Sequence, residues 1–201
     1  MEALEERSER QFDTWARWFD QRLGWFFSLA NRHLLRLLAP DARSRVLDVG
    51  CGTGILLQQM HELDTGLRLF GVDISFQMLT SARAKLPGSV ALHQGSASSL
   101  PYCSDAFDYV TCATSFHHYS DPLRALREMH RVLKPDGQLL FCEHGLSEEP
   151  AVARWQNRIT PVWKRFAGGC HLNRPIAELL QEGHFAIDQL LGLAEPVKVD
   201  A

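Results

Sequence analysis

Residues 46–54, VLDVGCGTG, constrain the fold of this chain more than any other segment, because a buried apolar strand runs directly into three alternating glycines. Gly50, Gly52 and Gly54 can adopt backbone angles that other residues avoid, and they let a ligand approach where a Cβ atom would collide. A segment of helical periodicity follows, and the N-terminus of a helix offers unpaired N–H groups. The segment therefore predicts a strand–turn–helix unit that binds a ligand.

The chain beyond Arg45 alternates short apolar runs with helical segments, which is the pattern of a parallel sheet with crossover helices. Strands are expected at residues 45–49, 67–73, 90–94, 107–113 and 138–143, and helices at 53–63, 75–86 and 121–133. Ser75 is expected to cap the second of these helices, and the Lys-Pro-Asp-Gly sequence at 134–137 predicts a turn before the fifth strand. The expected fold class is α/β, with a doubly wound, mostly parallel, Rossmann-like sheet.

The first forty residues carry aromatic side chains at helical spacing, interleaved with basic ones. They predict two helices with a break near Gly24. The aromatic side chains have two interpretations: they pack in the core, or they form a lid that also covers a ligand. We therefore expect one structural domain in two parts, a helical lid at residues 1–40 and the sheet domain at 41–201.

Composition limits the classes of protein to which the chain can belong. With 45% hydrophobic and 22% charged residues among 201, it has the material for one globular core. Its net charge of −3 supplies no general attraction for nucleic acids. Five cysteines without a CxxC spacing predict neither a disulfide framework nor a zinc ribbon, and adjacent histidines rarely bind one ion, so no metal site is expected.

The start of the chain is acidic, and no long uninterrupted apolar run occurs. These features predict a cytoplasmic protein with neither a signal peptide nor a membrane-spanning segment. A peripheral membrane contact and a homodimer stay open.

Two aspartates near the glycine turn narrow the class of ligand. Asp73 ends the second strand, where its carboxylate can accept both hydroxyls of a ribose. The GxGxG spacing differs from the GxGxxG of dinucleotide sites, and Asp48 beside the turn would repel a pyrophosphate and attract an ammonium group. A ligand with a ribose, an α-amino group and no phosphate fits S-adenosylmethionine better than a nicotinamide dinucleotide.

Four signatures, in the same order, resemble those of class I S-adenosylmethionine-dependent methyltransferases that act on small molecules. They are VLDVGCGTG at 46–54, GVD at 71–73, GSASSLPYCSDAFDYV at 95–110 and RVLKPDG at 131–137, within a resemblance that covers about residues 12–143. The opening FDTWARWFD at 12–20 is similar to the aromatic lid motif of many of these enzymes, which favours the lid interpretation for Phe12 and Phe19.

The resemblance also implies how the sheet ends, with a sixth strand and an antiparallel seventh. Residues 184–193 are the expected sixth strand. Because few residues follow them, the seventh strand is expected to be short, missing or supplied by another chain, and an exposed sheet edge there would favour pairing with a partner.

Cofactor contacts are implied at the tips of the first, second and fourth strands and in the lid, at Phe12, Asp48, Gly50, Cys51, Gly52, Gly54, Asp73, Ile74, Ser96, Ala97, Cys112 and Phe116. By resemblance, Asp48 would lie near the amino group of the cofactor, Asp73 on the ribose hydroxyls and Ile74 against the adenine. The family commonly has an acidic residue at the position of Ser96, where it bonds the adenine amine. Here the Ser96 hydroxyl and the Ala97 N–H are expected to serve the ring.

Acceptor residues are expected beyond the carboxyl ends of the fourth and fifth strands. His144, at the end of the fifth strand, could deprotonate a thiol, phenol or amine, so it is the candidate general base. The segment 155–174 predicts a helix before Gly168-Gly169 and another at 175–181, and its W…PxW…GGCHL…R pattern is weakly similar to the alkyl-thiol methyltransferases. The substrate pocket is expected to include His117, Trp155, Trp163, Cys170 and His171.

The leading hypothesis is an enzyme that transfers a methyl group from S-adenosylmethionine to a small, hydrophobic thiol, hydroxyl or amine. A quinone precursor or a phospholipid is the alternative acceptor. Two other classes stay open: a nicotinamide-dependent oxidoreductase, which the GxGxG spacing argues against, and a non-catalytic module that binds the cofactor.

Overall fold

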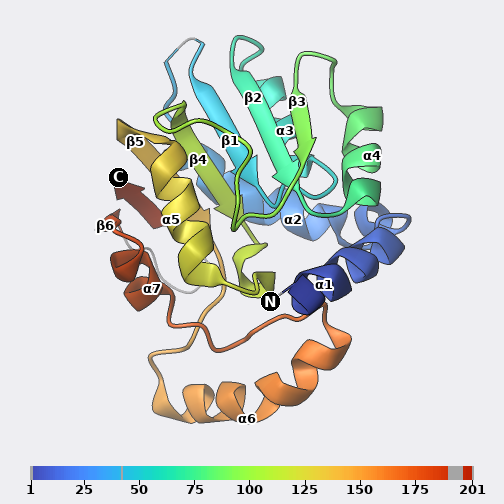
Figure 1. The fold of residues 1–201 in the computed structure, drawn as a ribbon, viewed down its shortest axis with the longest axis vertical. Helices are drawn as coiled ribbons and strands as arrows, with labels where there is room; N and C mark the ends of the chain where they lie inside the picture. Colours follow the sequence, from blue (N-terminus) through green and yellow to red (C-terminus); the bar gives the residue numbers. More distant parts are fainter. Residues whose placement is uncertain (1, 42, 190–196, 201) are drawn as a thin grey trace.

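The computed structural model describes residues 2–41, 43–189 and 197–200. Within them, seven strands form one sheet in the order β3-β2-β1-β4-β5-β7-β6 (Figure 1). The strands are β1 (Arg45–Val49), β2 (Arg68–Asp73), β3 (Ala91–Gln94), β4 (Phe107–Ala113), β5 (Leu133–Cys142), β6 (Ala186–Gln189) and β7 (Val197–Asp200). The first five are parallel, and β7 runs antiparallel to both of its neighbours. The predicted α/β class is confirmed.

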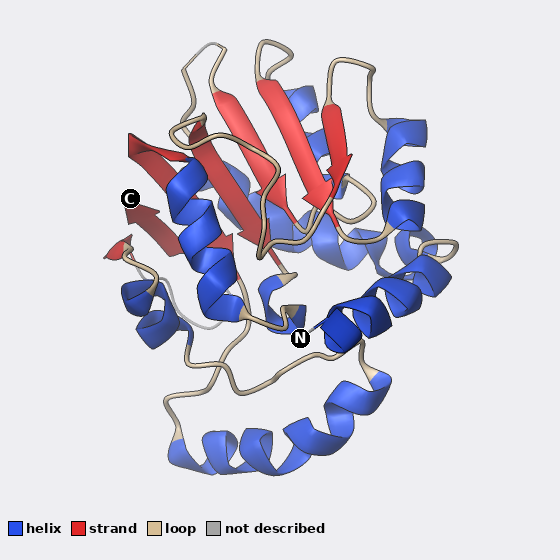
Figure 2. Ribbon diagram, viewed as in Figure 1, coloured by secondary structure: helices blue, strands red, loops and turns tan. Residues whose placement is uncertain are grey.

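Helices cover both faces of this sheet, as the blue ribbons around the red strands show in Figure 2. They are α1 (Glu2–Trp15), α2 (Phe19–Leu37), α3 (Ile55–Leu63), α4 (Phe76–Lys85), α5 (Pro122–Val132), α6 (Pro150–Phe166) and α7 (Ile176–Glu182). One buried cluster, under α2, α3 and α4, contains Val46 and Leu140, and the other, under α5 and α7, contains Leu47 and Leu139. Successive residues of a strand thus pack into the clusters on opposite faces of the sheet, which is why the sequences of the strands are continuous apolar runs.

Local signals explain two of the helix starts. The Ser75 hydroxyl accepts a hydrogen bond from the Met78 N–H at 3.1 Å, as predicted for the cap of α4. The Asp121 side chain accepts from the Arg124 N–H at 3.0 Å, and Pro122 occupies the first turn of α5. Both caps satisfy N–H groups that have no partner inside the helix.

The predicted turn at residues 134–137 is wrong, because these residues belong to β5. Leu133 pairs with Phe107, and the pairing resumes at Gln138 opposite Tyr109. The four residues between them form a bulge, which the ion pair between Lys134 Nζ and Asp108 at 2.6 Å holds against β4.

The predicted helix break near Gly24 is also wrong. α2 runs through Gly24, and the break between α1 and α2 falls at residues 16–18. Glycine inside a helix costs about 1 kcal/mol relative to alanine. Packing of α2 on α3 outweighs that cost, and a hydrogen bond from Asn31 Nδ2 to Gln59 Oε1 at 3.1 Å joins the two helices.

The end of the sheet settles one open expectation. The seventh strand is present in this chain and short, and Val199 pairs with Leu139 on one side and Ile187 on the other. Of the expected sixth strand, residues 186–189 form β6, whereas 190–193 lie outside the described residues. Among the helices that the structure describes, none has both the length and the apolar character needed to cross a bilayer.

Candidate cofactor site and the adjacent histidine cluster

A cavity of about 1050 Å³, open to solvent, lies at the carboxyl ends of β1, β2 and β4. Its walls are the glycine turn after β1, the segments that follow β2, β3 and β4, and the inner sides of α1 and α2. Figure 1 shows α1 below the tips of these strands. The expected cofactor residues that line the cavity are Phe12, Asp48, Gly50, Cys51, Gly52, Asp73, Ile74, Ser96 and Ala97.

Three expected cofactor residues lie outside this lining. Gly54 has a left-handed φ of +78° at the start of α3, and a Cβ atom there would lie 2.8 Å from Cδ1 of Leu86. Cys112 and Phe116 are fully buried in the core behind the cavity. Gly54, Cys112 and Phe116 therefore pack against other parts of the protein, whereas the other nine expected residues lie together around the cavity.

The glycine turn and Asp73 form one end of the cavity. Oδ2 of Asp73 accepts from the Gly52 N–H at 2.8 Å, and Oδ1 accepts from the Ser75 N–H at 2.9 Å. Each carboxylate oxygen can accept a second hydrogen bond, so the pair can still receive two hydroxyls of a ligand. A Cβ atom at Gly52 would meet nothing within 4 Å, which leaves the space beside the backbone open to a ligand. Burial raises the pKa of Asp73 to about 6.

Asp48 places a second carboxylate in the wall of the cavity. It is 3% exposed, and its Oδ1 accepts from the Thr111 hydroxyl at 2.8 Å. Burial and, to a smaller extent, the nearby charge of Asp73 raise the pKa of Asp48 to about 7. No cation among the described residues pairs with Asp48, so a positively charged group of a ligand is its natural partner.

Acidic residues of the lid fasten α1 and α2 to the rim of the cavity. Asp13 accepts from the Ser75 hydroxyl at 2.6 Å and from the Gln77 N–H at 3.1 Å. Asp20 accepts from the Thr53 hydroxyl and from Lys85, both at 2.5 Å. These contacts were not expected from the sequence, although acidic residues do interleave with the aromatic ones in residues 1–40.

A third lid carboxylate, that of Glu5, lies at the far end of the cavity from the glycine turn. Its Oε1 accepts from the hydroxyls of Ser96 and Ser120, both at 3.0 Å. The Ser96 hydroxyl also accepts from the Ser98 N–H at 3.1 Å, so its proton and one of its two lone pairs are engaged. A ligand that donates a hydrogen bond at this end of the cavity meets the carboxylate of Glu5, a residue not singled out from the sequence, beside the remaining lone pair of Ser96.

The expected acceptor residues lie outside the cavity lining, and four of them gather beside it. His117, His144, Cys170 and His171 form, with Glu143, a group that we call the histidine cluster. Trp155 and Trp163 lie on α6, and they are 56% and 46% exposed.

His118 connects the cluster to the cavity. It was not an expected site residue, but it lines the cavity, and its ring lies 4.0 Å from that of His117 and 4.9 Å from that of Phe12. Its Nδ1 lies 2.6 Å from the Gly168 carbonyl oxygen, to which it donates, so Nε2 carries the lone pair. Burial lowers the pKa of His118 to about 3, which keeps this ring neutral.

The predicted general base, His144, does not reach the cavity lining. Its side chain is 41% exposed, and its Nε2 lies 3.5 Å from Sγ of Cys170. Burial and the neighbouring His117 lower the pKa of His144, so the imidazole is neutral at physiological pH. A role as a base at the transferred methyl group stays a prediction.

Comparison with known proteins identifies the domain around the cavity. The family model described as "Methyltransferase domain" matches residues 47–141, which run from β1 into β5. Residues 47–141 are a class I methyltransferase domain. The predicted family is thereby confirmed, and its members use S-adenosylmethionine as cofactor.

Relatives of the domain are bacterial methyltransferases. An uncharacterized methyltransferase of Bacillus subtilis, YcgJ, is 36% identical over 125 residues, which are 59% of this chain and 47% of that protein. A demethylmenaquinone methyltransferase of Deinococcus radiodurans is 40% identical over 102 residues, 49% of this chain and 42% of that protein. The chain spans about half the length of the curated relatives it matches.

A solved structure shows the same architecture. It is an S-adenosylmethionine-dependent methyltransferase of Mesorhizobium loti, 26% identical, with a TM-score of 0.65 over 80% of this chain and 82% of that one. The cavity residues fit this cofactor. The open space at Gly52 admits a ligand against the backbone. Asp73 can accept hydrogen bonds from two further hydroxyls, and Asp48 can pair with a positively charged group of a ligand.

Proposed function

We propose that the protein transfers a methyl group from S-adenosylmethionine to a small, hydrophobic acceptor. One observation carries this proposal: the same cavity is lined both by the polar group of Asp73 and the glycine turn and by the apolar side chains of Phe12, Phe19 and Phe27. When bound, the cofactor supplies a methyl group on a positively charged sulfur. The lid side of the cavity then leaves room for an apolar molecule beside it.

We assign the cofactor contacts from the polar groups that face the cavity. Asp73 accepts the two ribose hydroxyls, and Asp48 pairs with the α-ammonium group. Glu5 accepts from the exocyclic amine of the adenine, while Ile74 packs on the ring and Ala97 offers its N–H. Glu5 thus performs from the lid the task that an acidic residue at position 96 would perform from the sheet.

The protein's contribution to the reaction is positioning in a dry pocket. Methyl transfer from a sulfonium is an in-line displacement, which proceeds when the nucleophile is held against the methyl carbon. The aromatic side chains of α1 and α2 that line the cavity shield one side of the bound reactants from water. Nε2 of His118, a neutral hydrogen-bond acceptor in the wall, can orient the hydroxyl or thiol of the acceptor.

Reduced quinone precursors are the first acceptor class to test. The Deinococcus radiodurans relative carries demethylmenaquinone in its name, and the apolar wall suits such a molecule. Alkyl thiols, to which the segment 155–174 points by its weak resemblance, are the second class. Phosphatidylethanolamine is the third.

The test is incubation of the full chain with isotopically labelled S-adenosylmethionine and each acceptor, followed by mass spectrometry of the products. We expect labelled product from one class, and no label without the protein. Binding of S-adenosylhomocysteine with no transfer to any class or to metabolite and lipid extracts would instead identify a cofactor-binding module. A thermal shift with NAD and none with S-adenosylhomocysteine would identify an oxidoreductase.

A further inference from the structure

Three side chains in the histidine cluster meet although they come from three segments of the chain. His117 follows β4, His144 follows β5, and Cys170 lies in the loop after α6. One ligand atom from each, two imidazole nitrogens and the thiol sulfur, lies within 4.8 Å of the other two. Imidazole and thiolate groups are the donors that zinc prefers in proteins.

The distance between two donor atoms of the cluster is close to the distance between two ligands of a tetrahedrally coordinated zinc ion. Zinc bonds of about 2.0 Å to nitrogen and about 2.3 Å to sulfur, at tetrahedral angles, separate the two donor atoms by about 3.6 Å. Sγ of Cys170 and Nε2 of His144 are 3.5 Å apart. A shift of about 1 Å at His117 would bring the third donor to the same spacing.

Glu143 supports His117 in the way that carboxylates support metal-binding histidines. Its Oε2 lies 2.6 Å from Nδ1 of His117, and its Oε1 accepts from the Phe116 N–H at 2.5 Å. A neutral His117 that donates its Nδ1–H to Glu143 presents the Nε2 lone pair to a cation. Carboxylate–histidine–metal relays of this kind fix the ring and raise the basicity of the ligand.

The loop that carries Cys170 is held in place by backbone contacts. Gly168 and Gly169 have left-handed φ angles of +61° and +80°, which turn the chain back after α6. The His171 N–H donates to the His117 carbonyl at 3.1 Å. His171 and Cys170 are adjacent in sequence, yet the His171 ring faces the His117 carbonyl, with its Nδ1 at 3.3 Å from that oxygen. The partner of Cys170 is therefore His144.

The charges around the cluster balance in favour of a cation. Arg174, 8% exposed, donates to the carbonyl oxygen of Tyr119, and its charge opposes a metal ion. The Glu143 carboxylate offsets it, and so does the thiolate that forms when Cys170 binds a cation and releases its proton.

We propose that His117, His144 and Cys170 bind one divalent cation of the zinc type, with a fourth position open to water or to an acceptor group. His117 and Cys170 are buried, while His144 is half-exposed and gives the ion access from solvent. The metal site stands without the proposed methyl transfer; only the use of the open position by an acceptor rests on that function. No metal site was expected from the sequence, because His117 and His118 do not share an ion and the other two donors are distant in sequence.

The test is a titration of the chelator-treated full chain with Co²⁺ alone, followed by displacement with Zn²⁺. We expect one cobalt per chain, the visible absorption of a four-coordinate ion, and a thiolate-to-cobalt charge-transfer band that zinc abolishes. Cys170→Ser should remove the charge-transfer band, and both Cys170→Ser and His144→Gln should weaken cobalt binding at least about 100-fold. Glu143→Gln should weaken it about 10- to 100-fold.

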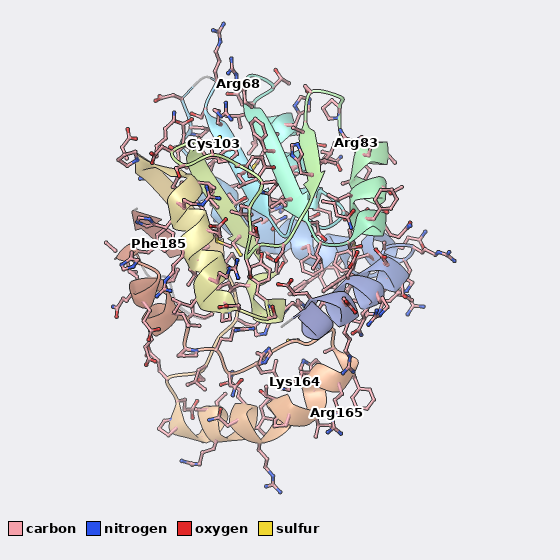
Figure 3. The ribbon with its side chains drawn as sticks, viewed as in Figure 1. Arg68, Arg83, Cys103, Lys164, Arg165 and Phe185 are labelled. Carbon is pink, nitrogen blue, oxygen red and sulfur yellow. The ribbon has the colours of Figure 1, made fainter. Side chains whose placement is uncertain are left out.

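The matched controls are Cys103→Ser and His61→Gln, which should bind cobalt as the unaltered chain does. Cys103 is exposed and lies in the loop before β4, well away from α6 (Figure 3). Folding of each variant is checked by circular dichroism, and His144→Gln, at a half-exposed position, serves if Cys170→Ser does not fold. The absence of cobalt binding, a cobalt spectrum without a sulfur band, or full binding by His144→Gln would each overturn the metal site. S-adenosylhomocysteine binding by calorimetry tests the proposed function separately.

Discussion

The cofactor end of the cavity and the histidine cluster lie at the same edge of one sheet, yet the chain encodes them differently. Gly52 and Asp48 stand within one contiguous segment, and Asp73 ends the next strand. Cys170 and His144 are 26 residues apart and meet only because β5, α6 and the following loop bring them together. A site whose residues follow neighbouring strands within a short stretch of sequence can be predicted from a motif. A site whose residues are joined by a long helix and loop can be predicted only once the course of that segment in the fold is known.

The largest effect on cofactor binding is expected for Asp73→Ala, which tests whether the site encoded by the motif holds the cofactor. Two hydrogen bonds from ribose hydroxyls to a charged acceptor are each worth about 1.5–3 kcal/mol. We expect calorimetry to show S-adenosylhomocysteine binding at least about 100-fold weaker. Asp136→Ala, at an exposed position in the β5 bulge, is the control and should bind normally. Unaltered binding in a folded Asp73→Ala variant would contradict the site assignment.

A second test concerns the pH dependence of binding at Asp48. Its pKa of about 7 in the empty cavity means that the carboxylate gains a proton as the pH falls through that value. An ammonium group binds the ionised form, so affinity should fall about tenfold between pH 8 and pH 6. Asp48→Asn should bind more weakly at pH 8 and lose most of this slope. An equal slope in both proteins would assign the pH dependence to another group, such as Asp73.

Glu5→Gln sharpens the comparison, because it tests a cofactor contact that comes from the lid and not from the motif. Replacing a charged acceptor by an amide should weaken S-adenosylhomocysteine binding about tenfold. An analogue with a 6-oxo group in place of the adenine amine cannot donate to Glu5 but can accept from the glutamine amide, so it should bind the variant at least as well as the unaltered chain. Glu6→Gln, on the same helix but paired with Arg10, is the control. Equal losses for both ligands would show that Glu5 holds the lid and does not read the amine.

The smallest effect is expected for Trp155→Ala. This side chain is 56% exposed on α6 and lies outside the cavity lining. Exposed substitutions of this kind change stability by less than about 0.5 kcal/mol. Cofactor affinity and the KM of a small acceptor should stay within about twofold of the unaltered values. A large rise in KM for the acceptor alone would restore Trp155 to the substrate pocket where the sequence placed it.

The sequence predicted the parallel strands and the Ser75 cap because these features depend on neighbours along the chain. Short apolar runs, glycine turns and cap residues are local signals. The helix break at residues 16–18 and the bulge at 134–137 were missed because packing on α3 and pairing with β4 override local preference. Glu5 was missed for a similar reason: its partners, Ser96 and Ser120, are 91 and 115 residues away.

The attachment of the lid has a consequence for the rate at which the cavity exchanges its contents. Asp13 and Asp20 hold α1 and α2 on the rim through short hydrogen bonds to Ser75 and Thr53. These contacts keep α1 and α2 over one side of a cavity that is open to solvent elsewhere, so we expect them to slow the association and the dissociation of a molecule as large as S-adenosylmethionine. Removing one of these hydrogen bonds should accelerate both association and dissociation of the cofactor, while the dissociation constant, which is the ratio of the two rates, changes little. If the protein transfers methyl groups as proposed, we expect release of the demethylated cofactor to contribute to the turnover time.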